Sequence, residues 1–426
     1  MKTSKVERSW ILYDWANSAY SIIITTAIFP LFYQTITTQQ TYLSTWAFGN
    51  SAASLLVGVL APVLGTIADY RGNKKRFFAA FFSLGVVSTC ALYFMSRGQW
   101  LSAILVYGLS VIGFSGANLF YDAFLIDVTT EQRMDRISSA GFAFGYIGGS
   151  TIPFVISIIL VLKYEAFGLA DRTDAYRLSF ILTAVWWALF SIPMLKNVKQ
   201  NYFIPPSQTP VADSFRRLKQ TFADIRKYRN TFVFLLAYFF YIEGVNTIIR
   251  MATPIAVGMG IAQTTLILIL LAIQVTAFPF ALLYGRLAAR FTGRKMIFVA
   301  IGIYTVVVFM AFFLPTVPDL ALRTKLFWVL SILVASSQGG IQALSRSYYG
   351  KNVPKEKSSE FFGFYNIMGK FSAIVGPLLV GVFTLLTGEE RYGILSVLVL
   401  FLSGGIILSR TKPEPDLVAS RTTKDR

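Results

Sequence analysis

The chain has 426 residues, 55% hydrophobic and only 14% charged, which excludes an ordinary soluble domain because such domains carry about 25% charged residues. It contains no histidine and one cysteine, so histidine-based acid–base chemistry, the commonest zinc ligand and an internal disulfide are excluded. The formal net charge of +18 suits either nucleic acid or a membrane surface, and the placement of the basic residues decides between them.

Apolar windows of about 20 residues, the length that crosses about 30 Å of hydrocarbon, recur from residues 10–33 to residues 392–408. About twelve such windows are separated by short polar loops. The first is too long for a cleaved signal peptide and lacks a small-residue cleavage site, so we expect it to remain as a helix. The predicted fold class is an all-α membrane protein with twelve transmembrane helices.

Most of the 39 Lys and Arg residues fall in loops that lie on one side of this arrangement. By the positive-inside rule that side is the cytoplasm, so both termini are predicted to be cytoplasmic. We therefore expect a multi-pass protein of the plasma (bacterial inner) membrane. The basic charge is interpreted as an orientation signal that also contacts anionic lipids, and no nucleic-acid partner is expected.

The two halves of the sequence resemble each other. Residues 65–76 align with residues 285–296, and residues 138–149 align with residues 358–369 at the same offset. Two matches in register, each at a corresponding loop or helix start, indicate a duplication. Six helices per half in the same orientation give two parallel six-helix repeats, as in major facilitator transporters.

The longest polar stretch separates the repeats and sets the expected domains. These are an N-terminal bundle over 1–196, a cytoplasmic linker over 197–230, a C-terminal bundle over 231–410 and a polar cytoplasmic tail over 411–426. Prolines at 205, 206 and 210 favour an extended start to the linker. Phe215, Leu218, Phe222 and Ile225 then recur at helical spacing, which predicts an amphipathic helix on the cytoplasmic leaflet; a solvated linker is the alternative.

The first copy of the loop at residues 65–76, GTIADYRGNKKR, resembles the signature that major facilitator transporters carry between their second and third helices. Asp69 can bond a neighbouring helix N-terminus, the glycines permit a tight turn, and the lysines keep the loop in the cytoplasm. Ile67 and Asn73 depart from the signature, and Ala289 replaces the aspartate in the second copy. An acid-mediated latch is therefore expected once. The conformational candidates are Gly65, Asp69, Gly72, Lys74 and Lys75.

Two longer stretches, residues 11–33 and 342–379, are similar to the vacuole-effluxer family, the "unknown major facilitator" branch that includes the fungal autophagy-related vacuolar amino-acid exporter. The resemblance covers most of the chain. It implies a twelve-helix facilitator for small solutes, with amino-acid efflux known in the fungal branch. Asp122 and Ile126 stand where the family would have asparagine and proline.

In such a fold the first and fourth helices of each half line a central cavity, so their polar residues are the substrate or coupling candidates. In helices 1, 4 and 10 these are Asp14, Asn17, Tyr20, Asn118, Asp122, Gln338 and Gln342. The paired amides of helices 4 and 10 suit hydrogen bonding to a polar solute, although they could instead join helices. Asp14 could carry a coupling proton or pair with a basic loop.

Helix 7 carries a polar stripe in which Glu243, Asn246, Thr247 and Arg250 share one face. Such a stripe has to face protein or water. Lys370 of helix 11 lies at about the depth of Glu243, roughly 15 Å from the cytoplasmic end, so we predict that the two charges pair. The alternative is that Lys370 binds an anionic substrate or lipid by itself. Arg250 could contact a substrate carboxylate or snorkel to the interface.

These observations predict a secondary active transporter that exports amino-acid-like solutes by alternating access. No G-x-x-x-x-G-K-[ST] loop is present, so the energy would come from a gradient. The alternatives are efflux of drugs, lipophilic compounds or lipids, and a non-transporting sensor. We expect no enzymatic activity, no cofactor and no metal. The expected partners are a small-molecule substrate, membrane lipids and a coupling proton or sodium ion, for a monomeric protein.

Overall fold

The computed structural model describes residues 3–205, 210–223, 227–371 and 375–412, and every statement about structure concerns these residues. They are helical, joined by short turns, with one isolated β-bridge between Tyr70 and Ile204. Within the described ranges, ten helices are long and apolar enough to cross a membrane. Two shorter apolar helices, Leu56–Ala68 and Val375–Thr387, occupy the positions of the expected second and eleventh spans.

The helices of the first six spans follow in chain order. They are α1 (Lys5–Tyr20), η1 (Ser21–Ala27), α2 (Ile28–Ile36), α3 (Gln39–Ala68), α4 (Asn73–Ala91), η2 (Leu92–Phe94), α5 (Trp100–Ala123), α6 (Leu125–Val128), α7 (Glu131–Phe144), η3 (Gly145–Thr151), α8 (Ile152–Leu162), η4 (Tyr164–Phe167) and α9 (Arg172–Asn197). The linker helix and the later spans follow. They are α10 (Pro210–Ala223), α11 (Arg229–Gly258), α12 (Gln263–Phe291), α13 (Gly293–Phe313), η5 (Leu314–Thr316), α14 (Leu320–Lys351), η6 (Lys355–Lys357), α15 (Ser358–Phe371), α16 (Val375–Thr387), α17 (Glu390–Ser396) and α18 (Leu398–Ser409).

The chain forms two compact units. Unit 1 consists of Met1–Thr129, Phe144–Gln220 and Pro354–Gly363, and unit 2 consists of Thr130–Ala143, Thr221–Val353 and Phe364–Arg426. The division passes through α7, α10 and α15, so each unit contains residues from both halves of the sequence. The domain boundaries expected from the sequence stay a prediction.

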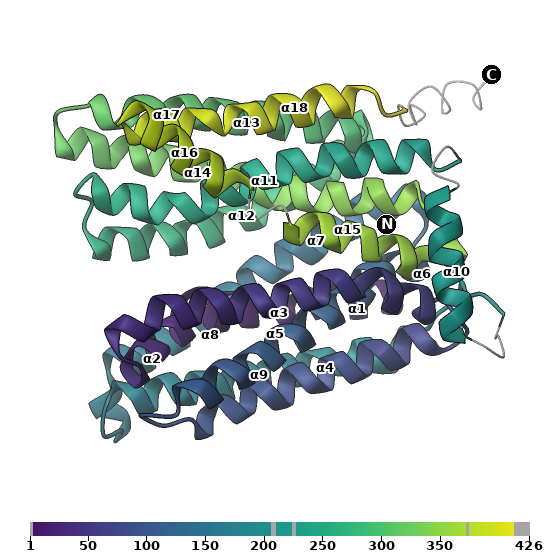
Figure 1. Ribbon diagram of the computed structural model, residues 1–426, viewed down its shortest axis with the longest axis horizontal. Coiled ribbons are helices and arrows are strands. Elements are labelled where there is room, and N and C mark those ends of the chain that lie inside the picture. The colour runs from purple at the N-terminus through teal and green to yellow at the C-terminus, as the bar shows by residue number, and fades with distance from the viewer. Residues whose placement is uncertain (1–2, 206–209, 224–226, 372–374, 413–426) are drawn as a thin grey trace. The chain divides into compact units, whose positions relative to one another are not determined.

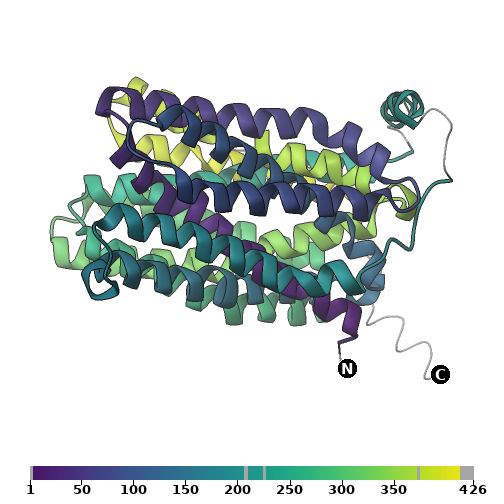
Figure 2. The ribbon, with the colours of Figure 1, turned by 90° about the horizontal axis from the view of Figure 1, so that it is seen from below.

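In unit 1 the long helices run along a common direction, with α4 packed between α5 and α9 and with α1 against α9 (Figure 1). The linker helix α10 runs across that direction: it is upright in Figure 1 and is seen end-on in Figure 2. In unit 2, α14 packs against α12 and α13, and α11 packs against α18. The apolar faces of these helices supply a buried aromatic core in each unit, with Trp10 and Trp187 in unit 1 and Tyr304 in unit 2.

Spans 1 and 5 each contain a π-helical stretch, η1 and η3, and η3 packs on α1 within unit 1. Glycines permit this close approach, since a Cβ atom at Gly148 would overlap the ring of Trp15. Stretches of π-helix occur frequently at functional sites because they re-aim side chains within a helix. Hydropathy and residue spacing alone do not indicate these two stretches.

Helices α4 and α5 approach closely at two glycines. A Cβ atom at Gly113 would overlap the backbone nitrogen of Gly85, whereas one at Gly108, on the same helix, would meet no atom within 4 Å. Gly113→Ala is therefore expected to lower the free energy of unfolding by about 1–3 kcal/mol through overpacking. Gly108→Ala is the matched control and is expected to be neutral or slightly stabilising. Thermal unfolding of the purified variants in detergent measures the difference, and equal melting temperatures would contradict it.

Candidate functional site

Asp69 lies directly after α3 and is fully buried. Its two carboxylate oxygens accept hydrogen bonds from the backbone N–H groups of Ser359 (2.8 Å) and Glu360 (3.0 Å), in the first turn of α15. These amides have no partner within their own helix, and the positive end of the helix dipole favours an anion there. The hydrogen bonding expected from Asp69 to a helix N-terminus is therefore present, and its role in transport stays a prediction.

The glycines of the loop permit this contact. A Cβ atom at Gly65 would overlap the carbonyl oxygen of Ser359, so α3 and the start of α15 touch through their backbones. Gly72 has a φ of +80° immediately before α4, a left-handed conformation that favours glycine. Both glycines thus have a steric reason to occupy these positions.

Burial and charge set the pKa of Asp69. Removal from water is the largest effect and raises the pKa to about 7, against the opposing influence of the Lys74 ammonium and the two backbone hydrogen bonds. The nearby carboxylate of Glu360 raises it further. A group with a pKa near 7 changes charge within the physiological pH range.

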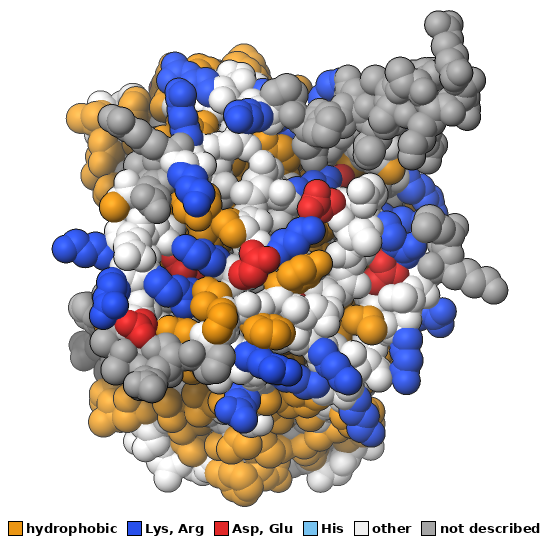
Figure 3. Space-filling view, turned by 90° about the vertical axis from the view of Figure 1, so that its right-hand side faces the viewer, with side chains coloured by type: hydrophobic (Ala, Val, Ile, Leu, Met, Phe, Trp, Pro, Cys, Tyr) orange, Lys and Arg blue, Asp and Glu red, His pale blue; other side chains and the backbone are white. Residues whose placement is uncertain are grey.

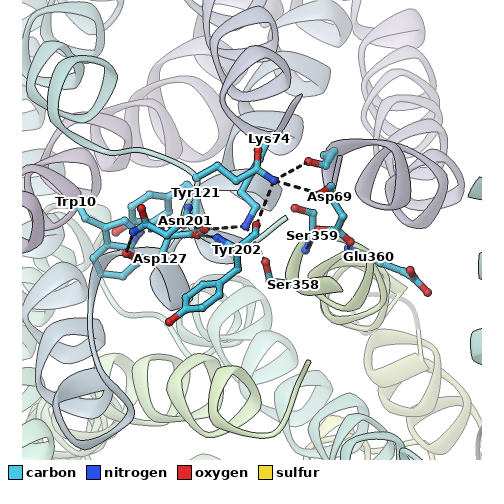
Figure 4. Close-up of polar contacts among 12 residues, drawn as sticks. Trp10, Asp69, Lys74, Tyr121, Asp127, Asn201, Tyr202, Ser358, Ser359 and Glu360 are labelled. Carbon is cyan, nitrogen blue, oxygen red and sulfur yellow. Dashed lines mark hydrogen bonds and ion pairs between the residues drawn. The ribbon is translucent and has the colours of Figure 1, made fainter. Parts of the chain in front are cut away.

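Lys74 is fully buried within the protein, and the cytoplasmic location expected for the loop lysines stays a prediction. Its ammonium lies 2.7 Å from the Asp127 carboxylate and donates to the Ser358 hydroxyl, also at 2.7 Å (Figure 4). A buried charge requires a partner, and Asp127 at the end of span 4 supplies it. Lys75 donates to the carbonyl oxygen of Val198 at 2.9 Å.

Asp127 is the centre of the polar contacts in Figure 4, and sequence reasoning missed it. Besides Lys74, its carboxylate accepts hydrogen bonds from the backbone N–H groups of Asn201 (2.7 Å) and Tyr202 (3.0 Å), in the linker. The Asn201 side chain also donates to the Asp127 carbonyl oxygen at 2.7 Å. The only signal in the sequence was an acid at the end of an apolar helix, and this does not indicate which residues contact it.

The candidates of spans 1 and 4 lie in unit 1 and are largely joined to one another. The Asn17 amide donates to the Asn118 side-chain oxygen at 2.8 Å, so this pair connects α1 to α5, which was the alternative considered for the amides. Tyr20 is fully buried, with its hydroxyl 2.8 Å from that of Ser110, and therefore belongs to the core of unit 1. Asp14 is buried and Asp122 is half-buried.

The candidates of spans 7, 10 and 11 lie in unit 2. Glu243 on α11 is fully buried, and its carboxylate accepts a hydrogen bond from the backbone N–H of Gly376, at the start of α16. Asn246, Gln338 and Gln342 are half-buried and Arg250 is exposed. The side chain of Lys370 falls outside the described residues, and so does its predicted pairing with Glu243.

A second polar cluster holds α7 within unit 2. The guanidinium of Arg346, 3% exposed, donates to the Ser138 hydroxyl at 2.9 Å and to the Ser138 carbonyl oxygen at 3.1 Å. Asp135 accepts hydrogen bonds from Lys351 and from the Ser347 hydroxyl, both at 2.6 Å. A Cβ atom at Gly285, in the second copy of the loop, would overlap the side chain of Ser139, so that copy lies next to this cluster.

Within the described part of the chain, no three His, Cys, Asp or Glu side chains lie close enough together to hold a metal ion. The polar groups described in the two units offer hydrogen bonds and charge. Their arrangement suits solute binding and conformational control.

Comparison with known proteins places this arrangement in a family. A model of the family described as "Vacuole effluxer Atg22 like" matches residues 41–131 and 126–414. The "Uncharacterized MFS-type transporter YxiO" of Bacillus subtilis (strain 168) is 50% identical over 428 residues, covering 99% of this chain and 98% of that protein. "Autophagy-related protein 22" of Cryptococcus neoformans is 27% identical over 295 residues, covering 66% of this chain and 53% of the fungal protein.

Solved structures agree on the fold. The major facilitator proton:xylose symporter XylE has a TM-score of 0.71 at 14% identity, covering 96% of both chains. The human organic anion transporter MFSD10 has a TM-score of 0.72 at 14% identity, covering 95% of this chain and 99% of the human one. The protein is an all-α membrane transporter of twelve helices in two parallel six-helix repeats, and it is not an enzyme. By the match of the family model and the relative that is half-identical along nearly its whole length, the chain belongs to the vacuole effluxer Atg22-like family of the major facilitator superfamily.

Proposed function

We propose that the protein is a secondary active transporter that exports amino-acid-like solutes from the cytoplasm. The observation that carries this proposal is Glu243, a carboxylate fully buried in an apolar span and bonded to the first turn of α16. An ionisable side chain within a membrane span is costly, and the acids found there usually mark substrate pathways or proton relays. Proton transfer to and from this carboxylate would couple solute movement to a gradient.

The side chains near Glu243 along its own helix support a polar solute. Asn246 is half-buried and Arg250 is exposed, three and seven residues further along α11. An amide and a guanidinium can donate hydrogen bonds to a substrate carboxylate. The family description as an effluxer supports export as the direction.

The orientation of the chain is part of the proposal. Lys and Arg side chains are frequent on the face shown in Figure 3, with few acidic side chains among them. The positive-inside rule assigns such a face to the cytoplasm. Both termini, the linker and the Asp69 loop would then be cytoplasmic.

We further propose that the bonds of Asp69 to the start of α15 break and re-form during the transport cycle. The residues of α15 up to Gly363 belong to unit 1 and the following ones to unit 2. Release of the first turn of α15 from Asp69 would allow this helix to move on the cytoplasmic side.

The proposal is tested with purified protein in proteoliposomes that are loaded with single amino acids, peptides or lipophilic cations. Counterflow of labelled amino acids is the expected result. Exchange of lipophilic cations alone would favour the multidrug alternative, and binding without flux would favour a sensor.

Two variants separate coupling from binding. Glu243→Gln is expected to abolish accumulation driven by a pH gradient while leaving counterflow, because the amide cannot carry the proton. Arg250→Ala is expected to raise the KM for amino acids about tenfold, the effect of losing one charge-assisted hydrogen bond. Glu165→Gln, at an exposed acid, is the control. Undiminished gradient-driven transport in Glu243→Gln would refute the coupling role.

A further inference from the structure

The linker between the two sequence halves is bonded to unit 1 before it reaches α10. The N–H of Ile204 donates to the Asp69 carbonyl oxygen at 2.8 Å, and the Gln200 side chain accepts from the N–H of Gly72 at 2.9 Å. The contacts of Asn201 and Tyr202 with Asp127 add to these. The first part of the linker therefore lies against both loops that carry the buried charges.

The helix that follows in the linker brings a guanidinium to the same place. Arg217 of α10 lies 3.2 Å from the Glu360 carboxylate and 3.8 Å from that of Asp69. It also donates to the Thr66 carbonyl oxygen at 3.4 Å, and its guanidinium lies 5.3 Å from the centre of the Tyr70 ring. Its side chain is only 15% exposed. The neighbouring Arg216 is 69% exposed and pairs with Asp213 in its own helical turn.

Two carboxylates, those of Asp69 and Glu360, are therefore buried close together at the first turn of α15. Asp69 and Glu360 are both fully buried. Two adjacent buried acids disfavour each other's ionised form, and the helix dipole offsets only part of that cost. The cations that face them in the described structure are Lys74, which also pairs with Asp127, and Arg217. Among the described side chains, Arg217 is the cation that Glu360 contacts.

The latch is the contact of the Asp69 carboxylate with the N–H groups of Ser359 and Glu360. We propose that Arg217 is a positioning residue of this latch: by neutralising Asp69 and Glu360 together, it allows the start of α15 to stay bonded to Asp69. The linker then contributes to the latch. The proposal rests on the role suggested above for the start of α15 in the transport cycle. It assigns to the linker a task beyond joining the two halves.

The test measures backbone hydrogen–deuterium exchange of the segment Pro354–Gly363 in the full-length protein in lipid nanodiscs. Arg217→Gln is expected to speed exchange there about tenfold, because loss of the cation leaves a buried carboxylate without its ion pair. Arg217→Lys is expected to recover most of the protection. Arg216→Gln is the matched control and is expected to behave as the unaltered protein.

The dependence of exchange on pH gives a second readout that a purely structural role would not move. The charged groups that face one another here are Asp69, Glu360, Asp127, Lys74 and Arg217. Without Arg217 the pH at which the segment loses protection is expected to shift upward, because Asp69 would lose a neighbouring cation and hold its proton more tightly. Arg216→Gln is expected to leave that pH unchanged.

If Arg217→Gln alone unfolds, the double variant Arg217→Gln/Glu360→Gln still tests the proposal. Removing the buried charge of Glu360 makes the guanidinium dispensable, so protection is expected to return in the double variant. Equal exchange in Arg217→Gln and Arg216→Gln, or no recovery in the double variant, would overturn the proposal. Exchange requires no substrate, so its outcome is independent of the counterflow measurements that test the transported solute.

Discussion

Asp127→Ala is expected to lower the melting temperature by about 10 °C, the largest single loss of stability in unit 1. The substitution leaves the fully buried ammonium of Lys74 without the carboxylate that lies 2.7 Å away. Breaking a buried pair from one side costs about 3–5 kcal/mol, and each kcal/mol shifts the melting temperature of a unit of this size by about 2–4 °C. Thermal unfolding in detergent, followed by tryptophan fluorescence, measures the change.

Two further variants show whether the stranded charge is the cause. Asp174→Ala removes the acid of a partly exposed pair with Arg177, and surface pairs contribute less than about 1 kcal/mol. The double variant Lys74→Met/Asp127→Leu removes both charges at once and is expected to recover part of the lost stability, since an apolar pair can replace a buried ion pair. Recovery is incomplete because the N–H groups of Asn201 and Tyr202 lose their acceptor. A loss in Asp127→Ala no larger than that in Asp174→Ala would show that the buried pair is not the determinant.

The second large effect concerns pH. Release of the start of α15 from unit 1 is expected to become easier as the pH rises from about 4 to about 7. In the held arrangement burial raises the pKa of Asp69 to about 7, whereas an exposed aspartate has a pKa of about 3.9. The held arrangement binds the proton more tightly, so its advantage is fully present below about pH 4 and declines as the pH rises through the raised pKa.

The full shift of about three pKa units corresponds to about 4 kcal/mol. Hydrogen–deuterium exchange of Pro354–Gly363 between pH 5 and pH 8 measures it. Asp69→Asn serves as the reference at every pH, because it cannot titrate there and cancels the intrinsic pH dependence of exchange. A ratio of rates that stays constant across the range would show that Asp69 does not titrate in the held arrangement.

Several properties of the protein could be predicted from the sequence because they depend on local composition. The length and hydropathy of each apolar window are independent of what it packs against, so the number of spans and the repeat could be inferred without coordinates. The hydrogen bonding of Asp69 to a helix N-terminus could also be anticipated, because the loop resembles a known signature. The family and its transport function followed from the same residues.

Polar partners within the units could not be predicted in the same way. Lys74 was expected only to keep its loop in the cytoplasm, and its burial against Asp127, 53 residues further along the chain, was not predicted. Tyr20 was expected near the substrate and is in the core with Ser110. Both outcomes depend on which helix faces are brought together, a property that hydropathy does not encode.

Twelve apolar spans in two related halves follow from the order of the amino acids, since the cost of placing apolar residues in water acts on each segment separately. Which buried charges meet depends instead on how the helices pack. The linker contacts Asp127 through backbone N–H groups, and Glu243 accepts from the backbone of Gly376. Such partners cannot be predicted from the sequence, because every residue other than proline has the same backbone donor. Packing determines which donor reaches a buried acid.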